Sequence, residues 1–544
     1  MQRDLRRLAD TEFDLVVIGG GIYGTTAAWD AALRGLSVAI IDRADFGSGT
    51  SFNSAKTVHG GVRMLQSGNV AGMRQFVRER RALSRIAPHL VHPLPFVIPT
   101  YRGLTRHRWV MRFGMAVNDL LSQDRNDLAD PAKYLPNSRL LSRDECLTLN
   151  PFIDPNGVTG GIEWFDCQMH NSDRVTLSFL LTAVAKGTVA ANYLECIGAL
   201  RRNHRVEGIV ARDRFSNDRF DIRARVVLNA AGPWAPPLLE TLAPGHATPL
   251  PRGLSKAMNL IVSRPMHGQH AVGGPAGSRL LFLAPWRGLT LVGTSHSPFR
   301  GAPDDFVATR SDVERFLHEV NAAFPALAIS LDDIRLVHRG LLPAQETTTD
   351  DIHLLKQSPV RDHRVDGAKG LLSVLGVRYT TARHTAQQAI DAVYAALGRP
   401  APMCRTAETP LLGGEFDDLS QLLHEADHTD SPEIDGTTRR HLALTYGTSR
   451  DVLLAALQSA PADRTPLGSN CSITRAEVRH AVRNEMAVHL SDAVLRRTEA
   501  GSAGHPGDDA LQAAAAVMSE ELGWSAARVE AEIAETNQVY VIPV

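Results

Sequence analysis

A glycine-rich turn between two apolar runs, near the start of the chain, constrains the fold more than any other stretch. Residues 15–18 form a short apolar run, and residues 25–33 have the composition of a helix. A second apolar run, residues 38–41, follows that helix. The turn after the first run carries three glycines in G-x-G-x-x-G spacing, Gly19, Gly21 and Gly24. This order predicts a βαβ unit whose strands are buried in a parallel sheet.

The same unit has the features of a dinucleotide site. Glycines at these positions allow a tight turn and let the backbone approach a pyrophosphate, which then lies at the helix N-terminus. Asp42 ends the second run, eighteen residues after Gly24, where a carboxylate accepts hydrogen bonds from a ribose diol. The alternative is a glycine-rich turn in an ordinary α/β protein. We predict a dinucleotide-binding unit because strand, helix, second strand and acidic residue occur together.

Length and composition limit the class of protein. The chain has 544 residues, which is long for a single average domain, and is 44% hydrophobic and 22% charged, as in soluble globular proteins. Its net charge of −1 creates no field that would recruit nucleic acid, so we expect no nucleic-acid partner. The five cysteines are scattered without C-x-x-C spacing, which favours a reducing, cytoplasmic compartment and no structural zinc. We find neither an apolar run of about 18 residues nor a secretory signal, and expect no membrane-spanning helix.

A loop of small and polar residues follows Asp42. Small side chains let the backbone press against a flat ligand, while hydroxyl and N–H groups serve its polar edge. The alternative is a solvated surface loop, but its place directly after the βαβ unit favours contact with a cofactor. The residues that we expect to contact the cofactor here are Thr50, Ser51, Ser54, Lys56 and His59.

Residues 50–63 of this loop carry a resemblance to a known family. Their sequence, T-S-F-N-S-A-K-T-V-H-G-G-V-R, looks like the T-S-x-x-S-S-K-x-x-H-G-G-x-R signature of FAD-dependent glycerol-3-phosphate dehydrogenases, which are DAO-like flavoproteins. The resemblance extends over nearly the whole chain. Further matching motifs are Glu79-Arg80, Ala87 to Leu90, Asn229 to Trp234, Pro285-Trp286, Gly293-Thr294 and Thr380-Thr381. The resemblance implies FAD as the cofactor.

Two later segments support FAD from the residues themselves. Residues 225–232 read as a buried strand that ends in small residues at Gly232. Residues 370–383 read as an apolar strand, then Gly376, then a helix that begins near Thr380 and Thr381. A helix N-terminus there would stabilise negative charge on a reduced flavin ring. An enzyme that binds only NAD would need neither segment.

The resemblance and the strand pattern together predict the architecture. We expect an α/β FAD-binding domain of the glutathione-reductase-like Rossmann type, an antiparallel-sheet substrate cap and an α-helical C-terminal domain. The predicted boundaries are 1–83, 166–240 and 346–400 for the FAD-binding domain, 84–165 and 241–345 for the cap, and 406–544 for the helical domain. The expected strands of a mixed or antiparallel cap sheet are Met258 to Ser263, Leu280 to Ala284, Leu289 to Gly293 and Ile334 to His338.

One stretch of the cap mixes cations with aromatic residues. Between Arg102 and Phe113 the chain places four arginines, one tryptophan and one phenylalanine. Such a composition suits the surface of a membrane, where the protein would bind peripherally at the inner face of the cell membrane. A cap helix with a solvated face explains the stretch equally well, and both interpretations stay open.

The C-terminal part reads as helical. Thr474 to Glu477 has capping-box spacing, and an apolar stripe that begins at Val478 runs to Leu495, with Gly501 after its end. We expect one helix there and two shorter helices after a loop at residues 501–507. The domain is expected to dock on the FAD-binding domain or to mediate self-association, as in a homodimer. We predict that His480, Glu485 and His489 are solvated surface groups and that the chain holds no metal.

The chemistry that we expect is hydride transfer from a carbon bearing a hydroxyl to the flavin, with a protein group accepting the hydroxyl proton. His59 is the titratable candidate for that group, although a histidine packed at the flavin edge would look the same. Arg63 is the candidate anchor for an anionic substrate, because a guanidinium offers a fixed fork of donors to phosphate or carboxylate. Arg378 joins them as a catalytic candidate. Further cations expected to bind substrate are Lys256, Arg339 and Arg361, the last of which would otherwise be a surface ion-pair partner.

The chain departs from the motifs of the family at several positions. Leu342 stands where the resemblance expects a substrate-facing arginine, and Met64 stands for a tyrosine. Arg378 replaces a lysine and His296 replaces an aspartate. The chain has as many cations as the family motifs, but at different positions. We therefore expect an anionic substrate, sn-glycerol 3-phosphate or a related small phosphorylated polyol, with electrons passed to quinone or another acceptor.

Two other functions remain open from the sequence. One is a flavin amine or hydroxy-acid oxidase of the same broad fold, which would need a carboxylate anchor but no phosphate site. The other is a non-catalytic flavoprotein whose lost arginine at position 342 reports a site retained only for binding.

Overall fold

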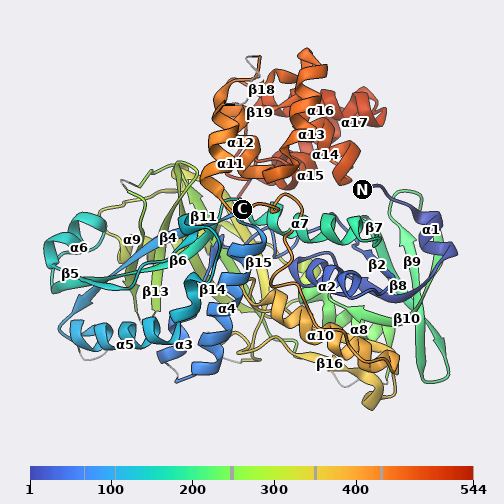
Figure 1. The fold of residues 1–544 in the computed structure, drawn as a ribbon, viewed down its shortest axis with the longest axis horizontal. Coiled ribbons are helices and arrows are strands. Elements are labelled where there is room, and N and C mark those ends of the chain that lie inside the picture. The colour runs from blue at the N-terminus through green and yellow to red at the C-terminus, as the bar shows by residue number, and fades with distance from the viewer. Residues whose placement is uncertain are drawn as a thin grey trace.

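The computed structural model describes residues 1–66 (without the side chain of Gln66), 68–103, 106–245, 250–266, 268–277, 279–347, 352–428 and 433–542. Two large sheets lie side by side, and the C-terminal helices, orange to red in Figure 1, pack above them. No helix among these residues is both long and apolar enough to cross a bilayer.

Parallel strands form the centre of the first sheet. β1 (Glu12–Ile18) pairs in parallel with β2 (Val38–Ile41) on one side and with β10 (Arg219–Asn229) on the other. With α2 (Ile22–Leu33) between β1 and β2, the predicted βαβ unit is confirmed. The sheet has the order β16-β17-β10-β1-β2-β7, and β9 joins β8 to β10. Its other strands are β7 (Val189–Ala191), β8 (Leu194–Arg202), β9 (Arg205–Asp213), β16 (Val360–Asp362) and β17 (Leu371–Val374).

Both faces of the first sheet are covered by helices. Leu15 and Val17 of β1 belong to the core formed with α2, α7 (Ser172–Ala185) and α10 (Ala382–Leu397). Val16 and Ile18, which point the other way, belong to the core formed with α1 (Leu5–Asp10) and α8 (Ala235–Leu242). This burial on two faces is why the strand reads as a continuous apolar run rather than as an alternating one.

The second sheet is mixed, as predicted for the cap. Its order is β15-β11-β14-β13-β12-β4-β6-β3, with β5 paired to β6. β12 and β4 run parallel and the other pairs are antiparallel. The strands are β3 (Thr57–Val58), β4 (Val91–Tyr101), β5 (Arg139–Leu141), β6 (Val158–Met169), β11 (Leu254–Val262), β12 (Ala271–Ala276), β13 (Arg279–Trp286), β14 (Leu289–Phe299) and β15 (Ile334–Pro343). Helices beside this sheet are α3 (Val62–Gln66), α4 (Val70–Ile86), α5 (Arg108–Leu121), α6 (Arg143–Leu149) and α9 (Arg310–Ala323).

Strands of the second sheet come from either side of the predicted domain boundaries. β3 lies within residues 1–83, yet it pairs with β6, and β6 itself crosses the boundary at residue 165. The division of the chain into domains stays a prediction, to which the structure adds the sheet that each strand joins.

The C-terminal region is helical, as predicted. Its elements are α11 (Leu419–His428), α12 (Gly436–Tyr446), α13 (Arg450–Ser459), α14 (Arg475–Glu485), α15 (Leu490–Asp492), a π-helical turn (Ala493–Arg497), α16 (Asp508–Leu522) and α17 (Ala526–Gln538), with a small hairpin of β18 (Pro466–Gly468) and β19 (Cys471–Thr474). Thr474 and Glu477 form the predicted capping box of α14. The prediction of a single helix as far as Leu495 is wrong, because the chain leaves the helix at Met486, which has a φ of +60°.

Buried ion pairs join this helical region to the first sheet. Asp45, in the loop after β2, is fully buried, and Arg497 donates to its two oxygens at 2.6 and 2.7 Å. Arg496 donates to the same carboxylate at 2.6 Å. On α7, Arg174 lies 2.6 Å from Glu485 at the end of α14. Removing one partner of such a pair leaves an uncompensated buried charge, so these contacts hold the two regions in a defined arrangement.

The prediction that His480, Glu485 and His489 are solvated surface groups is wrong. Glu485 is 1% exposed, and His480 lies 3.3 Å from it. His489 Nδ1 lies 2.8 Å from a carboxylate oxygen of Glu532 on α17. These side chains form part of the packing between helices, and polar spacing alone did not reveal that they are partnered.

Candidate active site

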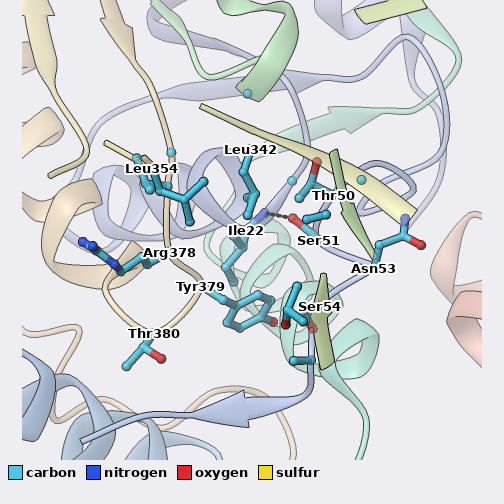
Figure 2. Close-up of a pocket in the computed structure, with 18 of the residues that line it drawn as sticks. Ile22, Thr50, Ser51, Asn53, Ser54, Leu342, Leu354, Arg378, Tyr379 and Thr380 are labelled. Atoms are coloured by element: carbon cyan, nitrogen blue, oxygen red, sulfur yellow. Dashed lines mark hydrogen bonds between the residues drawn. The ribbon is translucent and has the colours of Figure 1, made fainter. Parts of the chain in front are cut away.

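A cavity of about 1490 Å³ lies between the two sheets. It is larger than the roughly 300–1,000 Å³ of sites for drug-sized ligands, so it has room for an extended cofactor and a second small molecule. Its walls come from the β1–α2 turn, residues 42–64, residues 230–241, strands β13 to β15, and residues 376–380. Figure 2 shows part of this lining.

The β1–α2 turn forms one end of the cavity. Gly19 has a φ of +106°, and a Cβ there would lie 2.6 Å from the carbonyl oxygen of Ala230, which directly follows the neighbouring strand β10. Gly24 faces inward instead, where a Cβ would lie 1.8 Å from the carbonyl oxygen of Gly19, so it serves the close packing of α2 on the turn. The N-terminus of α2 receives a hydroxyl from the loop, because the backbone N–H of Ile22 donates to Ser51 Oγ at 2.9 Å (Figure 2).

Asp42 also lies on the cavity wall, at the end of β2. Its two oxygens accept hydrogen bonds from the backbone N–H groups of Gly20, at 2.6 Å, and Ala44, at 2.8 Å. Burial, with a smaller contribution from the nearby Asp45 carboxylate, raises the pKa of Asp42 to about 6. Each carboxylate oxygen keeps a further lone pair, so Asp42 can accept hydrogen bonds from a ribose as predicted.

The loop of residues 50–56 is fastened to the second sheet. Thr50 Oγ1 donates to the carbonyl oxygen of Leu341 at 2.8 Å, and Asn53 Oδ1 accepts from the backbone N–H of Arg339 at 2.8 Å. Ser54 lines the cavity, and its buried hydroxyl has no hydrogen-bond partner among the described residues. A buried hydroxyl without a partner is costly, so a ligand with a polar edge fits here.

The predicted later segments reach the same cavity. Gly232 and Gly376 line it, as does Thr380, whose hydroxyl accepts from the backbone N–H of His59 at 3.3 Å. Thr381 is the N-cap residue of α10, so the helix begins where the sequence predicted it. The glycine turn and the helix N-terminus offer N–H donors, the Asp42 carboxylate offers acceptors, and the Ser54 hydroxyl is free to do either. The dinucleotide and ring of FAD require groups of these kinds, so the residues present fit this cofactor.

Arginines line the cavity away from the glycine turn. Arg63 of α3 has no hydrogen-bond or ion-pair partner in the described parts of the chain, and desolvation followed by the charge of Arg279 lowers its pKa. Arg279, at the start of β13, donates to the carbonyl oxygen of Thr294 at 3.2 Å and pairs with Glu319. Arg378 lies at the edge of the cavity, with its guanidinium directed away from Ser51 in Figure 2 and bonded to the carbonyl oxygen of Lys356 at 2.5 Å.

His59 lines the cavity beside a held carboxylate. Its Nδ1 lies 3.6 Å from Asp166 Oδ2, and its side chain is 53% exposed. Asp166 is buried, and its other oxygen accepts from the backbone N–H of Gly60 at 2.8 Å and from Arg80. These bonds fix the carboxylate, which can in turn orient an imidazole that faces open space.

Leu342 lines the cavity as the sequence predicted, on β15. Figure 2 shows Leu342 and Leu354 projecting into the cavity. Met64 follows Arg63 on α3 and also lines the cavity. This part of the wall is apolar, so a charged ligand must be held from another side.

Four of the cations predicted for the site do not line the cavity. Lys256 Nζ lies 2.7 Å from both oxygens of Asp312, and Arg361 is paired with Asp366 at 2.9 Å, so the placement of both in the pocket is wrong. The four residues are Lys56, Lys256, Arg339 and Arg361.

Lys56 and Arg339 contribute to the loop in other ways. The ammonium group of Lys56 is fully buried and donates to the carbonyl oxygen of Phe52 at 2.8 Å and to Ser172 Oγ at 2.9 Å, so it fastens the loop to α7 rather than facing a cofactor. Asp173 lies 3.5 Å away and compensates the charge. Arg339 contributes its backbone N–H to Asn53, as described above.

Arg279 and His296 line the cavity near Arg63, yet neither was predicted as a site residue. In the sequence, His296 stands out only because it replaces the aspartate of the family motif. Arg279 lies in no motif. Alternation along β13 would not have indicated Arg279, because the lining residues Leu280, Phe282 and Ala284 occupy the alternate positions of that strand.

Comparisons with known proteins agree with this geometry. Residues 14–389 match the protein family described as FAD dependent oxidoreductase, and residues 404–529 match the family described as the C-terminal domain of alpha-glycerophosphate oxidase. A glycerol-3-phosphate dehydrogenase of Synechocystis sp. is 30% identical, and the alignment covers 98% of each chain.

Two further proteins are similar over most of their length. Glycerol-3-phosphate dehydrogenase 2 of Mycobacterium tuberculosis is 32% identical over 97% of this chain and 88% of its own. The crystal structure of the glycerol-3-phosphate dehydrogenase from Bacillus halodurans complexed with FAD superposes with a TM-score of 0.75 at 26% identity, covering 99% of this chain and 96% of that one.

Proposed function

Because this chain belongs to the FAD-dependent oxidoreductase family, and within it to the FAD-dependent glycerol-3-phosphate dehydrogenases, we propose that it oxidises sn-glycerol 3-phosphate or a closely related phosphorylated polyol. The secondary alcohol of the substrate becomes a ketone. FAD, when bound, supplies the acceptor for the hydride that leaves the carbon. Asp42, Ser54 and the glycine turn are the residues that we assign to holding FAD.

His59 is our candidate for the group that takes the hydroxyl proton. It lies on the same cavity as the arginines, with one ring nitrogen near Asp166. A carboxylate beside Nδ1 favours the tautomer with its proton on that nitrogen, which leaves Nε2 as the acceptor. The proton then moves from the substrate hydroxyl to His59 Nε2 while the carbon loses hydride, so charge and atoms balance.

Arg63 is our candidate for the phosphate anchor. Its guanidinium has no protein partner among the described residues, faces the cavity and belongs to the same loop region as His59. A fork of donors holds a phosphate in one orientation and thereby positions the neighbouring alcohol. Arg378, whose guanidinium points away from the turn, would close the other side.

The observation that carries the proposal is that one cavity joins two chemically different ends. Asp42 and the glycine turn provide a site for a dinucleotide, whereas Arg63 and Arg279 provide positive charge for a second, anionic molecule. An amine oxidase of the same fold would need an anchor for a carboxylate beside an uncharged amine, and a site kept only for binding would not need His59 near a fixed carboxylate.

Anaerobic bleaching of the flavin tests the proposal. The purified holoenzyme is mixed with glycerol 3-phosphate, glycerol, lactate or glycine, and the flavin absorbance is followed. We expect bleaching by glycerol 3-phosphate and none by glycerol, which has the same alcohol but no phosphate. Bleaching by glycine alone would identify an amine oxidase, and no bleaching by any of these and other polyol phosphates would favour a non-catalytic flavoprotein.

We further propose that helix α5 binds the surface of a membrane. A quinone within that membrane would then receive the electrons from the flavin. Trp109, Phe113 and Leu120 of this helix are 62%, 73% and 64% exposed. Arg108 and Arg112 accompany them, a combination of apolar and basic side chains that suits a lipid interface with anionic headgroups. Residues at the start of α5 line the cavity, so this surface lies next to the proposed reaction site.

Sedimentation with lipid vesicles tests this second proposal. We expect the protein to sediment with vesicles that contain phosphatidylglycerol and expect Trp109→Ser with Phe113→Ser to abolish this. The control is Val365→Ser, because Val365 is 78% exposed and lies in the turn His363–Asp366 between β16 and β17, not on α5. Equal sedimentation of wild type and double variant would contradict membrane binding through α5.

A further inference from the structure

Three groups that carry or can acquire positive charge meet at one end of the cavity. Arg63 comes from α3, Arg279 from the start of β13 and His296 from β14, and all three line the cavity. They are close enough to influence one another: the charge of Arg279 lowers the pKa of Arg63, and burial, followed by the charges of Arg279 and Arg63, lowers the pKa of His296 to about 4. We call these three residues the anion end of the cavity.

The hydrogen bonds of His296 tie it to the strand next to Leu342. Its Nδ1 lies 3.2 Å from Ser255 Oγ on β11, which runs between β14 and β15. Ser255 is also the residue paired across the sheet with Leu342. His296 and Leu342 therefore lie on opposite sides of β11, and a protonated His296 would supply the positive charge that Leu342 lacks.

The anion end has little compensating negative charge. Glu319 of α9 neutralises part of Arg279 from outside. Lys256, the neighbour of the residue paired with His296 on β11, is already paired with Asp312. Arg63 has no carboxylate partner among the described residues. Burial of the imidazole, followed by the charges of Arg279 and Arg63, disfavours a further positive charge here, so an unliganded His296 stays neutral at neutral pH.

We propose that Arg63, Arg279 and His296 bind the dianionic group of the substrate and that binding is accompanied by uptake of one proton on His296. The proposal rests on the proposed function for the identity of that group, a phosphate monoester, but the site itself would accept any tetrahedral dianion. A dianion beside His296 reverses the sign of the local charge and favours the imidazolium, which then donates a hydrogen bond from Nε2.

The sign of the pH dependence follows from this linkage. Free His296 is neutral above about pH 4, whereas bound His296 keeps its proton to a higher pH. Between these two pKa values each binding event consumes a proton, so affinity falls as pH rises, by up to about tenfold per pH unit. Arg63 and Arg279 remain charged over this pH range. His59 is the other histidine that lines the cavity, so the experiment includes a His59 variant as a control.

Calorimetric titration of the FAD-loaded holoenzyme with sulfate tests the proposal. Sulfate is a dianion at every pH used, so any proton that is taken up must go to the protein. Measurement between pH 5.5 and 8 in buffers of different ionisation enthalpy gives the number of protons. We expect wild type to take up close to one proton at the low end of the range and to bind more weakly as pH rises.

The variants decide which residue takes up the proton. His296→Gln and, as a second version, His296→Asn should lose the linked proton and bind sulfate about tenfold or more weakly at pH 5.5, with a nearly flat pH profile. His59→Asn should keep the linked proton. Arg279→Gln should weaken binding at every pH. FAD content and thermal unfolding show whether each variant is folded.

Several outcomes would overturn the proposal. They are an undiminished proton uptake in both His296 variants, loss of the uptake in His59→Asn, or a wild type that does not bind sulfate. Failure of glycerol 3-phosphate to bleach the flavin, combined with proton-linked sulfate binding that requires His296, would refute the proposed substrate and leave the anion end intact.

Discussion

The Nδ1 of His59 lies 3.6 Å from the Oδ2 of Asp166, a carboxylate whose other oxygen is held by Gly60 and Arg80. The fixed member of this pair is the carboxylate, and the movable one is the imidazole that faces the cavity. Such an arrangement lets the histidine approach a substrate hydroxyl while its tautomer remains defined.

Replacement of His59 by asparagine should therefore remove the proton acceptor without harm to the fold. We expect kcat for flavin reduction to fall by about 10²- to 10⁴-fold, with unchanged FAD content, because the side chain is half-exposed. Anaerobic stopped-flow reduction measures this. His424→Asn, on α11 and away from the cavity, is the control. A kcat equal to that of wild type would assign the proton to another group.

Loss of the Asp42 carboxylate should weaken FAD binding. A charge-assisted hydrogen bond is worth roughly 1.5–3 kcal/mol. Because Asp42 would form two such bonds to the ribose, the affinity of Asp42→Ala for FAD should be on the order of a hundredfold lower. Fluorescence titration of apoprotein measures it, with Asp10→Ala at an exposed position as the control. An unchanged affinity would reduce Asp42 to a turn residue.

The affinity for FAD should also depend on pH through Asp42. The pKa of its carboxyl group is raised to about 6 by burial, and only the ionised form accepts both ribose hydrogen bonds. Wild-type affinity should therefore fall as pH drops through 6, because the acid must release a proton before binding. The Asp42→Ala variant should show a flatter profile over the same range, and parallel profiles would exclude Asp42 as the titrating group.

Arg63 and Arg361 provide a matched pair of arginines. Arg63 faces the cavity without a partner among the described residues, and Arg361 is paired with Asp366 outside the lining. Arg63→Ala should raise KM for glycerol 3-phosphate by about tenfold or more, with little change in FAD content. Arg361→Ala should leave KM near that of wild type. Steady-state kinetics with a dye acceptor separates them, and equal effects would show that neither arginine binds the substrate.

Leu342 should limit the use of glycerol 3-phosphate. Loss of a charged hydrogen bond to phosphate in a desolvated pocket costs about 2–4 kcal/mol, or roughly thirty- to several hundred-fold in kcat/KM. We expect a modest wild-type value that rises in Leu342→Arg but not in Leu354→Arg, a second leucine of the same cavity. A wild-type kcat/KM already above about 10⁴ M⁻¹ s⁻¹ would show that the leucine is harmless.

The ion pair between Asp45 and Arg497 should be a major source of stability. Both groups are buried, so Asp45→Asn leaves Arg497 without a carboxylate partner among the described residues and leaves Arg496 with Asp492 alone. We expect the free energy of unfolding to fall by about 3–5 kcal/mol. Urea denaturation measures it. Asp10→Asn, at an exposed pair with Arg6, should cause no measurable change. A loss as small as that of the control would show that the buried contact is dispensable.

The sequence predicts the backbone of this protein better than it predicts the site. The βαβ unit, the mixed cap sheet and the capping box at Thr474 follow from local patterns of spacing and polarity, and the structure contains them. The same reasoning predicts one long C-terminal helix, and this prediction is wrong. The chain leaves the helix at Met486, where Met486 and Glu485 are buried and Glu485 pairs with Arg174 of α7, a contact that local spacing does not reveal.

Some predictions of side-chain roles are wrong for a related reason. Lys256 and Arg361 have the right charge for a phosphate site, yet carboxylates elsewhere in the fold already neutralise them. Conversely, Arg279 belongs to no motif and His296 departs from one, and the two meet because β13 and β14 are neighbours in the sheet. Whether a cation is available to a ligand depends on such partners, which one sequence does not record.

The contact between Asp45 and Arg497 joins positions 452 residues apart. The loop that bears Asp42 and Asp45 is made near the beginning of synthesis, and its counter-charges are made near the end. During translation this loop lacks its counter-charges until the segment that bears Arg496 and Arg497 has been made. We therefore expect a chain truncated before Arg496 to retain flavin more weakly than the whole chain.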